Sequence, residues 1–255
     1  NHQIKNIVDP TDAQDAVTFG LLLEKISNLQ DQIDALQSTS GSGTVTDQDG
    51  NSYPYLTFGD QVWTVKNAEM VTYRDGTPIP QVTDATEWAN LTTGAWCYYD
   101  NDPSKGKLYN WYAVAGIHDN DENTPNKEFA PEGWHVPSDA EWTELENYLI
   151  SNGYNFDSSI GTNKIAKSLA SVEGWHQIGG IEYPGNQQQH LNNKSGFNAF
   201  PAGYRSNGES GNSGKAAFFW CSDNQSLRYL EYHRRELVSS SNYPQFGISV
   251  RLIRD

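Results

Sequence analysis

The sequence predicts an α+β domain preceded by an N-terminal helix. Three observations lead to this prediction. Apolar residues recur at heptad spacing in the first forty residues, a capped amphipathic helix is expected near residue 140, and short alternating segments bounded by turn residues are typical of β-strands. The domain would have few long regular elements and many loops.

The first helix is predicted over residues 11–38, as a parallel coiled coil. Its apolar side chains are spaced by three and four residues in turn, which is a heptad seam. A helix with one apolar stripe pairs with copies of itself or packs back on its own domain, and the pattern does not decide between two and three strands. Residues 39–44 are predicted as a Gly/Ser linker. The residues predicted to mediate oligomerisation are Phe19, Leu22, Ile26, Leu29, Ile33 and Leu36.

The remaining residues, 45–255, are predicted to form one domain. Two alternating segments joined by Gly59-Asp60 indicate a hairpin. The firmest helix is expected over 139–150, where Ser138 and Glu141 have capping-box spacing. The last predicted strand alternates apolar and polar residues, as a half-buried strand does. The other predictions are hairpin strands at 53–58 and 61–65, helices at 84–92 and 164–170, and strands at 217–220, 227–233 and 247–253.

Composition excludes two classes of partner. The 255 residues contain 17 Lys and Arg against 32 Asp and Glu, giving a formal net charge of −15. Nucleic acid would be repelled by this charge. No apolar run reaches the roughly 20 residues that a membrane helix needs, so no membrane insertion is expected.

Two acidic stretches contain ligands that would suit calcium. Asp47, Asp49 and Asn51 place oxygens at alternate positions around a glycine, but the glutamate that completes an EF-hand is missing. An Asp-Gly turn explains the same residues. The run from Asp119 to Glu122 allows either calcium or a solvated acidic loop. We therefore expect no cofactor, with calcium as the alternative.

The sequence gives no positive sign of catalysis. No zinc-hydrolase, serine-hydrolase or nucleotide-binding motif is present, and His135 is interpreted as a hydrogen-bonded structural residue. The two cysteines, Cys97 and Cys221, are either two buried thiols or one long-range disulfide. The protein is therefore expected not to be an enzyme.

A segment near the C-terminus is the candidate binding site. It concentrates basic and polar side chains around Tyr229 and Tyr232, whose flat rings are typical of recognition surfaces. An ordinary solvated hairpin is the alternative interpretation. The predicted ligand-binding residues are Trp220, as support or stacking platform, and Ser222, Asp223, Asn224, Arg228, Glu231, His233, Arg234 and Arg235.

Ten ordered motifs resemble a known family. They are TDQDGNSYPYLTFGDQVWTVKNAE, DGTPIP, GAWCYYDND, LYNWYAVAG, APEGWHVPSDAEWTELENYL, NKIAKSLAS, GFNAFPAGYRSNG, FFWCSDN, RYLEY and GISVRLIRD. Together they strongly resemble the Fibrobacter succinogenes major paralogous domain, over nearly all of residues 45–255. That family is similar to the sulfatase-modifying-factor branch of the C-type lectin-like fold, so the resemblance implies a C-type lectin-like head. It is common in secreted and surface proteins of Bacteroidetes and their phages.

The N-terminal segment IKNIVDPTDAQDAVTFG resembles the motif that ends a repeat where phage tail fibres enter a coiled coil. Residues 1–10 would then end a preceding fibre segment. Such fibres are usually trimeric, so the resemblance implies a homotrimer attached to an upstream fibre or baseplate protein. It also implies an extracellular location, on a virion tail fibre or a bacterial cell surface.

The function implied by both resemblances is a receptor-binding fibre tip that recognises a cell-surface glycan or protein. The alternatives are a structural cap or spacer of a filament, and an enzyme of the formylglycine-generating type. Those enzymes use two neighbouring cysteines late in the domain, whereas here only Cys221 is late. The family commonly has WWSS where this chain has Phe219 to Ser222, so Cys221 is an individual substitution. The calcium-dependent sugar motifs of animal lectins are also missing.

Overall fold

Antiparallel strand pairing organises the chain from Gly43 onward. The computed structural model describes Lys25 and residues 41–255, and residues 43–255 form one compact unit. The predicted coiled-coil helix lies outside the described residues, with its seam residues Phe19, Leu22, Ile26, Leu29, Ile33 and Leu36, and it stays a prediction. Strand β1 begins at Gly43, so the last two residues of the predicted linker belong to the domain.

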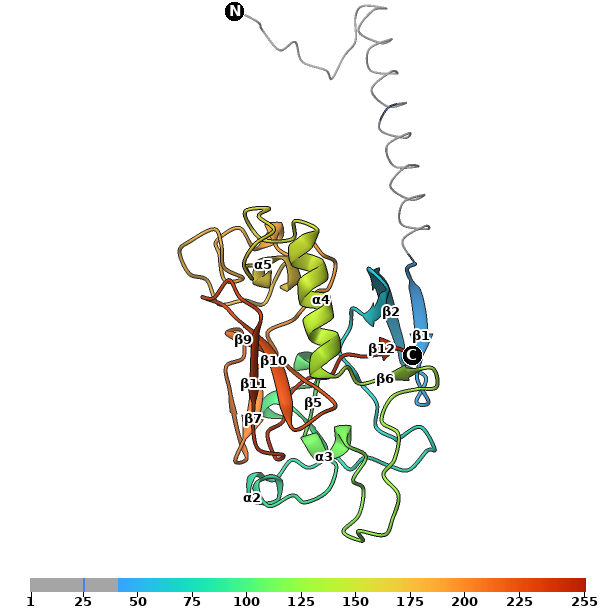
Figure 1. Cartoon of the computed structure of the whole chain (residues 1–255). Helices are drawn as coiled ribbons and strands as arrows, with labels where there is room; N and C mark the ends of the chain where they lie inside the picture. Colours follow the sequence, from blue (N-terminus) through green and yellow to red (C-terminus); the bar gives the residue numbers. More distant parts are fainter. Residues whose placement is uncertain (1–24, 26–40) are drawn as a thin grey trace, which may run out of the picture. The chain divides into compact units, whose positions relative to one another are not determined.

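The larger sheet has five strands in the order β1-β2-β3-β12-β6. The strands β2 and β3 form the predicted hairpin around Gly59, whose φ of 64° is the left-handed conformation that glycine favours. Strand β12 lies between β3 and β6, so the two ends of the domain meet in one sheet (Figure 1). The bounds are β1 Gly43–Thr46, β2 Ser52–Phe58, β3 Gln61–Thr64, β6 Trp134–His135 and β12 Ile253–Arg254.

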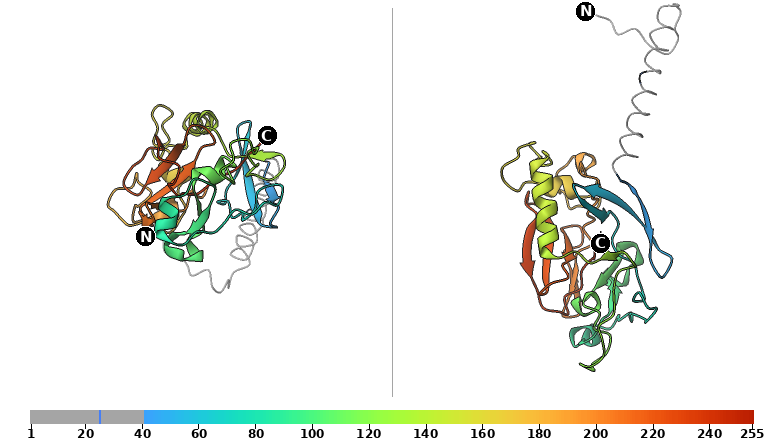
Figure 2. Two further views of the ribbon diagram at one scale, coloured as in Figure 1. Left: turned by 90° about the horizontal axis from the view of Figure 1, so that it is seen from below. Right: turned by 45° about the vertical axis from the view of Figure 1, so that its right-hand side comes forward.

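The second sheet has three strands in the order β11-β10-β9, and helix α4 lies along one of its faces (Figures 1 and 2). Helix α4, Asp139–Ser151, confirms the helix predicted over 139–150. Its capping box is formed by Ser138 and Glu141, and it buries Trp142, Leu145 and Leu149. The strands are β9 Ala216–Trp220, β10 Ser226–Glu231 and β11 Val238–Ser241.

The α+β prediction is wrong for residues 41–255, which are predominantly β. They form twelve strands and four α-helices, and α4 alone among these helices exceeds five residues. The predicted helices at 84–92 and 164–170 are present but shorter, as the single turns α2 and α5. The other elements are α2 Ala85–Ala89, α3 Trp111–Val114, α5 Ala166–Leu169, β4 Trp96–Tyr98, β5 Lys107–Tyr109, β7 Tyr204–Ser206, β8 Glu209–Gly211, and the 3₁₀ turns η1 Tyr99–Asn101, η2 Pro103–Lys105 and η3 Gln189–Leu191.

The strand predicted over 247–253 is also wrong. Three of its seven residues, Gly247, Ile248 and Ser249, form isolated bridges to three different partners, and only its last residue joins β12. It is buried on both sides rather than half-buried. The polar Arg251 is 1% exposed and donates to the carbonyl oxygens of Thr64, Phe197 and Asn198. Polar side chains at alternate positions here serve internal hydrogen bonds instead of solvent.

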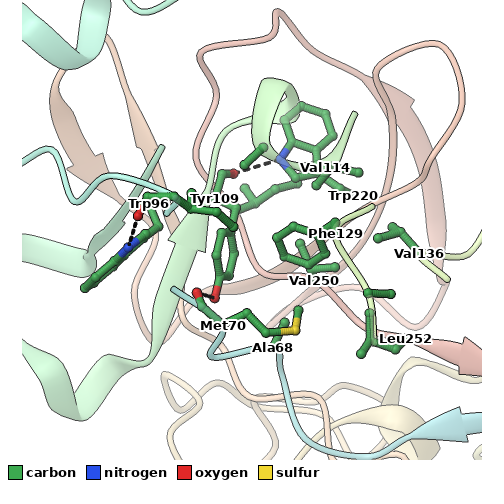
Figure 3. Packing of buried hydrophobic residues seen from close by; sticks show 14 of the residues in the cluster. Ala68, Met70, Trp96, Tyr109, Val114, Phe129, Val136, Trp220, Val250 and Leu252 are labelled. Carbon is green, nitrogen blue, oxygen red and sulfur yellow. Dashed lines mark hydrogen bonds between the residues drawn. The ribbon is translucent and has the colours of Figure 1, made fainter. Parts of the chain in front are cut away.

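Aromatic side chains with internal hydrogen bonds lie in the core around segment 247–253. In Figure 3 the indole of Trp220 donates to the carbonyl oxygen of Tyr109 at 2.9 Å, and the Tyr109 hydroxyl donates to that of Met70 at 2.8 Å. These bonds satisfy polar atoms within the apolar packing. Among the described residues no helix has the length and apolar character to span a bilayer.

Candidate functional site

A groove lies on the face of the three-stranded sheet opposite α4. It has a volume of about 390 Å³, and four of its nine lining residues are aromatic. Because side chains alternate along a strand, Leu227, Tyr229 and Glu231 of β10 share this face. We call it the aromatic groove, and its lining residues are Tyr204, Ser206, Phe218, Leu227, Tyr229, Glu231, Ser240, Asn242 and Phe246.

Two pairs of rings build the groove. Phe218 and Tyr229 are direct partners across β9 and β10, and their rings stack with centroids 5.3 Å apart. Tyr204 of β7 lies 4.8 Å from Phe246, and Phe246 also meets Phe218 edge to face. Phe218 and Phe246 are nearly buried, whereas Tyr204 and Tyr229 are half-buried. The two tyrosines are therefore the rings that present surface to a ligand.

Polar atoms at the groove are left available for binding. Within residues 41–255, the hydroxyls of Tyr204, Tyr229 and Ser240 have no hydrogen-bond partner, although the Ser206 hydroxyl bonds that of Tyr243. The carboxylate of Glu231 is paired with Arg234, with Oε2 2.8 Å from Nε. Partly exposed rings beside unengaged hydroxyl groups are typical of small-molecule sites.

Glycine makes room for one of the exposed rings. A Cβ at Gly211 of β8 would lie 2.7 Å from the ring of Tyr204. Any larger residue there would push this ring from its place beside Phe246. The β7–β8 hairpin therefore holds Tyr204 by close packing against backbone.

Two of the predicted ligand-binding residues are structural. Arg228 is 4% exposed and points to the other face of the sheet, where it binds Asp139, Thr143 and Glu146 of α4. Trp220 is fully buried, so it does not meet a ligand, but its ring packs edge to face against Phe246 of the groove, with centroids 6.4 Å apart. Strand alternation explains why the Arg228 side chain points away from the groove, because its two neighbours in β10 face the groove.

The other predicted residues fall at opposite ends of β10. Ser222, Asp223 and Asn224 lie in or near the β9–β10 turn, where Asp223 accepts from the first backbone N–H of α4. Glu231, His233, Arg234 and Arg235 lie at the other end, about 20 Å away for a six-residue strand. Arg235 pairs with its neighbour Glu236. Of the predicted set, Glu231 alone lines the aromatic groove.

Sequence reasoning missed the rings of the other strands. Tyr229 was recognised as a contact residue, but Tyr204, Phe218 and Phe246 were not. Alternation within β9 and β10 could have indicated which residues of each strand share a face with Phe218 or with Tyr229. The pairing register and the approach of β7 come only from the folded chain.

The calcium candidates have other roles in the fold. One carboxylate oxygen of Asp47 accepts from the backbone of Asp49 and Asn51, and the other accepts from the Asn51 amide and the Tyr53 hydroxyl. Asp49 accepts from Val71 and Thr72. The Asp49 carboxylate therefore links this turn to the backbone at Val71 and Thr72. No group of three or more His, Cys, Asp or Glu positioned for a metal occurs in the part of the chain that the structure describes.

The acidic loop from Asp119 to Glu122 borders a separate surface hollow. Asp119 and Asp121 accept hydrogen bonds from backbone N–H groups of the loop itself, which is typical of a solvated turn. The backbone and amide groups of Asn123 lower the pKa of Asp121. The loop therefore stabilises its own anionic form.

The two cysteines are free and buried in different parts of the core. Burial raises the pKa of Cys97 to about 11 and that of Cys221 to about 12. A thiol with so high a pKa is a poor nucleophile at neutral pH. The alternative of a disulfide is excluded, and the pair does not resemble the adjacent cysteines of formylglycine-generating enzymes.

His135 has partners at both ring nitrogens. Its Nδ1 lies 2.6 Å from Asp255 and its Nε2 lies 2.8 Å from Glu141. Ser222 and His135 both line a small surface hollow, but no nitrogen of the His135 ring is left to activate the Ser222 hydroxyl. His135 is thus a structural link, as its sequence context indicates.

The groove lies within the region that matches a known family. A sequence model described as the Fibrobacter succinogenes major domain matches residues 56–254. No curated protein and no solved structure matches the chain. The matched region covers most of the chain and agrees with the ten motifs read from the sequence. The chain therefore belongs to the Fibrobacter succinogenes major domain family.

Proposed function

We propose that the domain is a non-enzymatic receptor-binding module that holds a cell-surface carbohydrate in the aromatic groove. The observation that carries this proposal is the pair of half-buried rings, Tyr204 and Tyr229, whose hydroxyls are unengaged beside Ser240. The apolar C–H face of a sugar packs on an aromatic ring, while its hydroxyl groups need hydrogen-bond partners at the edge. The groove offers both kinds of contact.

The size of the groove favours a carbohydrate over a protein receptor. A volume of about 390 Å³ lies at the lower end of the range for small-ligand sites. A stable protein interface involves roughly 20–30 residues on each partner, whereas nine residues line this groove. One or two sugar rings would fill it.

The biological setting that we propose comes from the sequence resemblances. The module would form the tip of a phage tail fibre or a bacterial surface fibre, outside the cell, joined to an upstream fibre or baseplate protein. We also propose that residues 11–38 join three copies into a homotrimer. Three modest sites on one particle then gain by avidity.

Binding to whole bacterial cells tests the proposal. We expect the complete chain to bind candidate host cells in a saturable way, and Tyr229→Ala to weaken this binding at least tenfold. Tyr183→Ala is the matched control, because Tyr183 is also half-buried but does not line the groove. The melting temperature of each variant, compared with that of the unchanged protein, checks that both variants are folded.

Three outcomes would contradict the proposal. Equal loss of binding in both variants would place the receptor contact elsewhere. Cell binding that survives enzymatic removal of surface carbohydrate would indicate a protein receptor. Absence of binding to every surface tested would favour a structural cap or spacer of a filament.

A further inference from the structure

The charges around the aromatic groove are unevenly placed. Glu231 is the one charged residue among those that line it, and no Lys or Arg does. Arg234 lies beside Glu231, but its Nε is already held at 2.8 Å by the carboxylate. The groove therefore presents no uncommitted cation to a ligand.

Strand geometry explains why the neighbouring arginines stay out of the groove. Arg205 lies between Tyr204 and Ser206 in β7, so its side chain points to the opposite side. There it donates to the carbonyl oxygens of Val82 and Thr83 and lies over the ring of Trp88 at 4.8 Å.

The same alternation acts on β10. Arg228 lies between Leu227 and Tyr229, and it is bound to α4 on the far face of the sheet. Both arginines are about 4% exposed. Moving either into the groove would break several buried hydrogen bonds, so these cations are not available to a ligand.

An acidic sugar would meet an unfavourable environment here. A carboxylate or sulfate in the groove would lie near the Glu231 carboxylate, without a free cation to compensate the loss of hydration. An uncharged sugar avoids both costs. It can stack on Tyr204 and Tyr229 and hydrogen-bond to their hydroxyls, to Ser240 and to the side-chain amide of Asn242.

We propose that the aromatic groove selects uncharged sugars and rejects those that carry a carboxylate or a sulfate. This inference rests on the proposed function and names the ligand class of the same site. A basic sugar gains little, because it would have to compete with Arg234 for the Glu231 carboxylate.

Pairs of oligosaccharides that differ by an acidic group test this selection. The probes are an immobilised set containing N-acetyllactosamine with its 3′-sulfated and 3′-sialylated forms, and tetragalacturonic acid with its methyl ester. We expect saturable binding to uncharged members, and binding at least tenfold weaker for each acidic counterpart. Glu231→Gln removes the carboxylate charge and frees Arg234, so it should narrow this difference about threefold or more. Tyr229→Ala should abolish the binding of both kinds.

The outcomes separate this inference from the proposed function. Tight binding of acidic members that is lost in Tyr229→Ala would overturn the charge selection while supporting a carbohydrate-binding groove. An unchanged difference in Glu231→Gln would overturn the assignment of the rejection to the Glu231 carboxylate. No binding to any oligosaccharide in the set would overturn both proposals.

Discussion

Arg228 shows how a residue that resembles a binding group stabilises the fold instead. Its guanidinium lies 2.8 Å from Asp139 and 3.2 Å from Glu146, and it also donates to Thr143. Burial raises the pKa of Glu146, and the neighbouring Arg228 charge opposes this shift. One side chain thus joins the middle strand of the sheet to two turns of α4.

Loss of this arginine should destabilise the domain. Arg228→Ala leaves two carboxylates beside the sheet without their cation, and we expect the free energy of unfolding to fall by about 2–3 kcal/mol, since both acids keep some contact with water. Urea denaturation measures this change. Arg235→Ala is the control, because that side chain is 48% exposed, and its effect should stay within about 0.5 kcal/mol. If Arg228→Ala lowered the free energy of unfolding as little as Arg235→Ala, the contacts of Arg228 with α4 would contribute no net stability.

At the scale of elements, His135 links three segments. It belongs to β6, and it binds Glu141 in the first turn of α4 and Asp255, which follows β12. Burial alone would lower the pKa of His135, but the hydrogen bonds to Asp255 and Glu141 raise it. Burial alone would raise the pKa of Glu141, but hydrogen bonds from Ser138 and His135 outweigh this effect and lower the pKa.

This link should make stability depend on pH. A raised histidine pKa contributes stability that is complete below the unfolded value, near 6.5, and is lost as the pH rises through the folded value. A lowered glutamate pKa contributes stability that is complete above the unfolded value, near 4.5, and is lost as the pH falls through the folded value. The loss of stability caused by His135→Gln should therefore be greater at pH 5.5 than at pH 8.5, by about 0.5 kcal/mol, because solvent screens this half-exposed group. Urea denaturation of both proteins at the two pH values measures it, and an equal loss at both would contradict the link.

Elements whose contacts are local could be predicted from the sequence, whereas elements that depend on distant pairing could not. The β2–β3 hairpin and α4 carry their own signals, in Gly59-Asp60 and in the Ser138–Glu141 capping box. Segment 247–253 alternates like a half-buried strand, yet it is fully buried, because it bridges to residues of the distant strands β5, β7 and β9. The aromatic groove was missed for the same reason. Tyr204 and Phe246 are 42 positions apart, and no local pattern indicates that they meet.

At the scale of the whole molecule, net charge and groove chemistry agree. The chain carries a formal charge of −15, so long-range forces repel it from the anionic surfaces of most cells. Attachment would then depend on short-range contacts such as ring stacking and hydrogen bonds. Raising the salt concentration screens the repulsion and leaves these contacts nearly unchanged.

Several such grooves acting together would compensate for a modest affinity at each one. We therefore expect the complete chain to bind cells at least a hundredfold more tightly than a fragment of residues 43–255, which is the compact unit of the structure. Both should bind a soluble oligosaccharide with equal affinity, because each groove is complete within that unit. Mass in solution should show a trimer for the chain and a monomer for the fragment. Equal cell binding by a trimer and a monomer would exclude avidity, and a monomeric complete chain would refute self-association through residues 11–38.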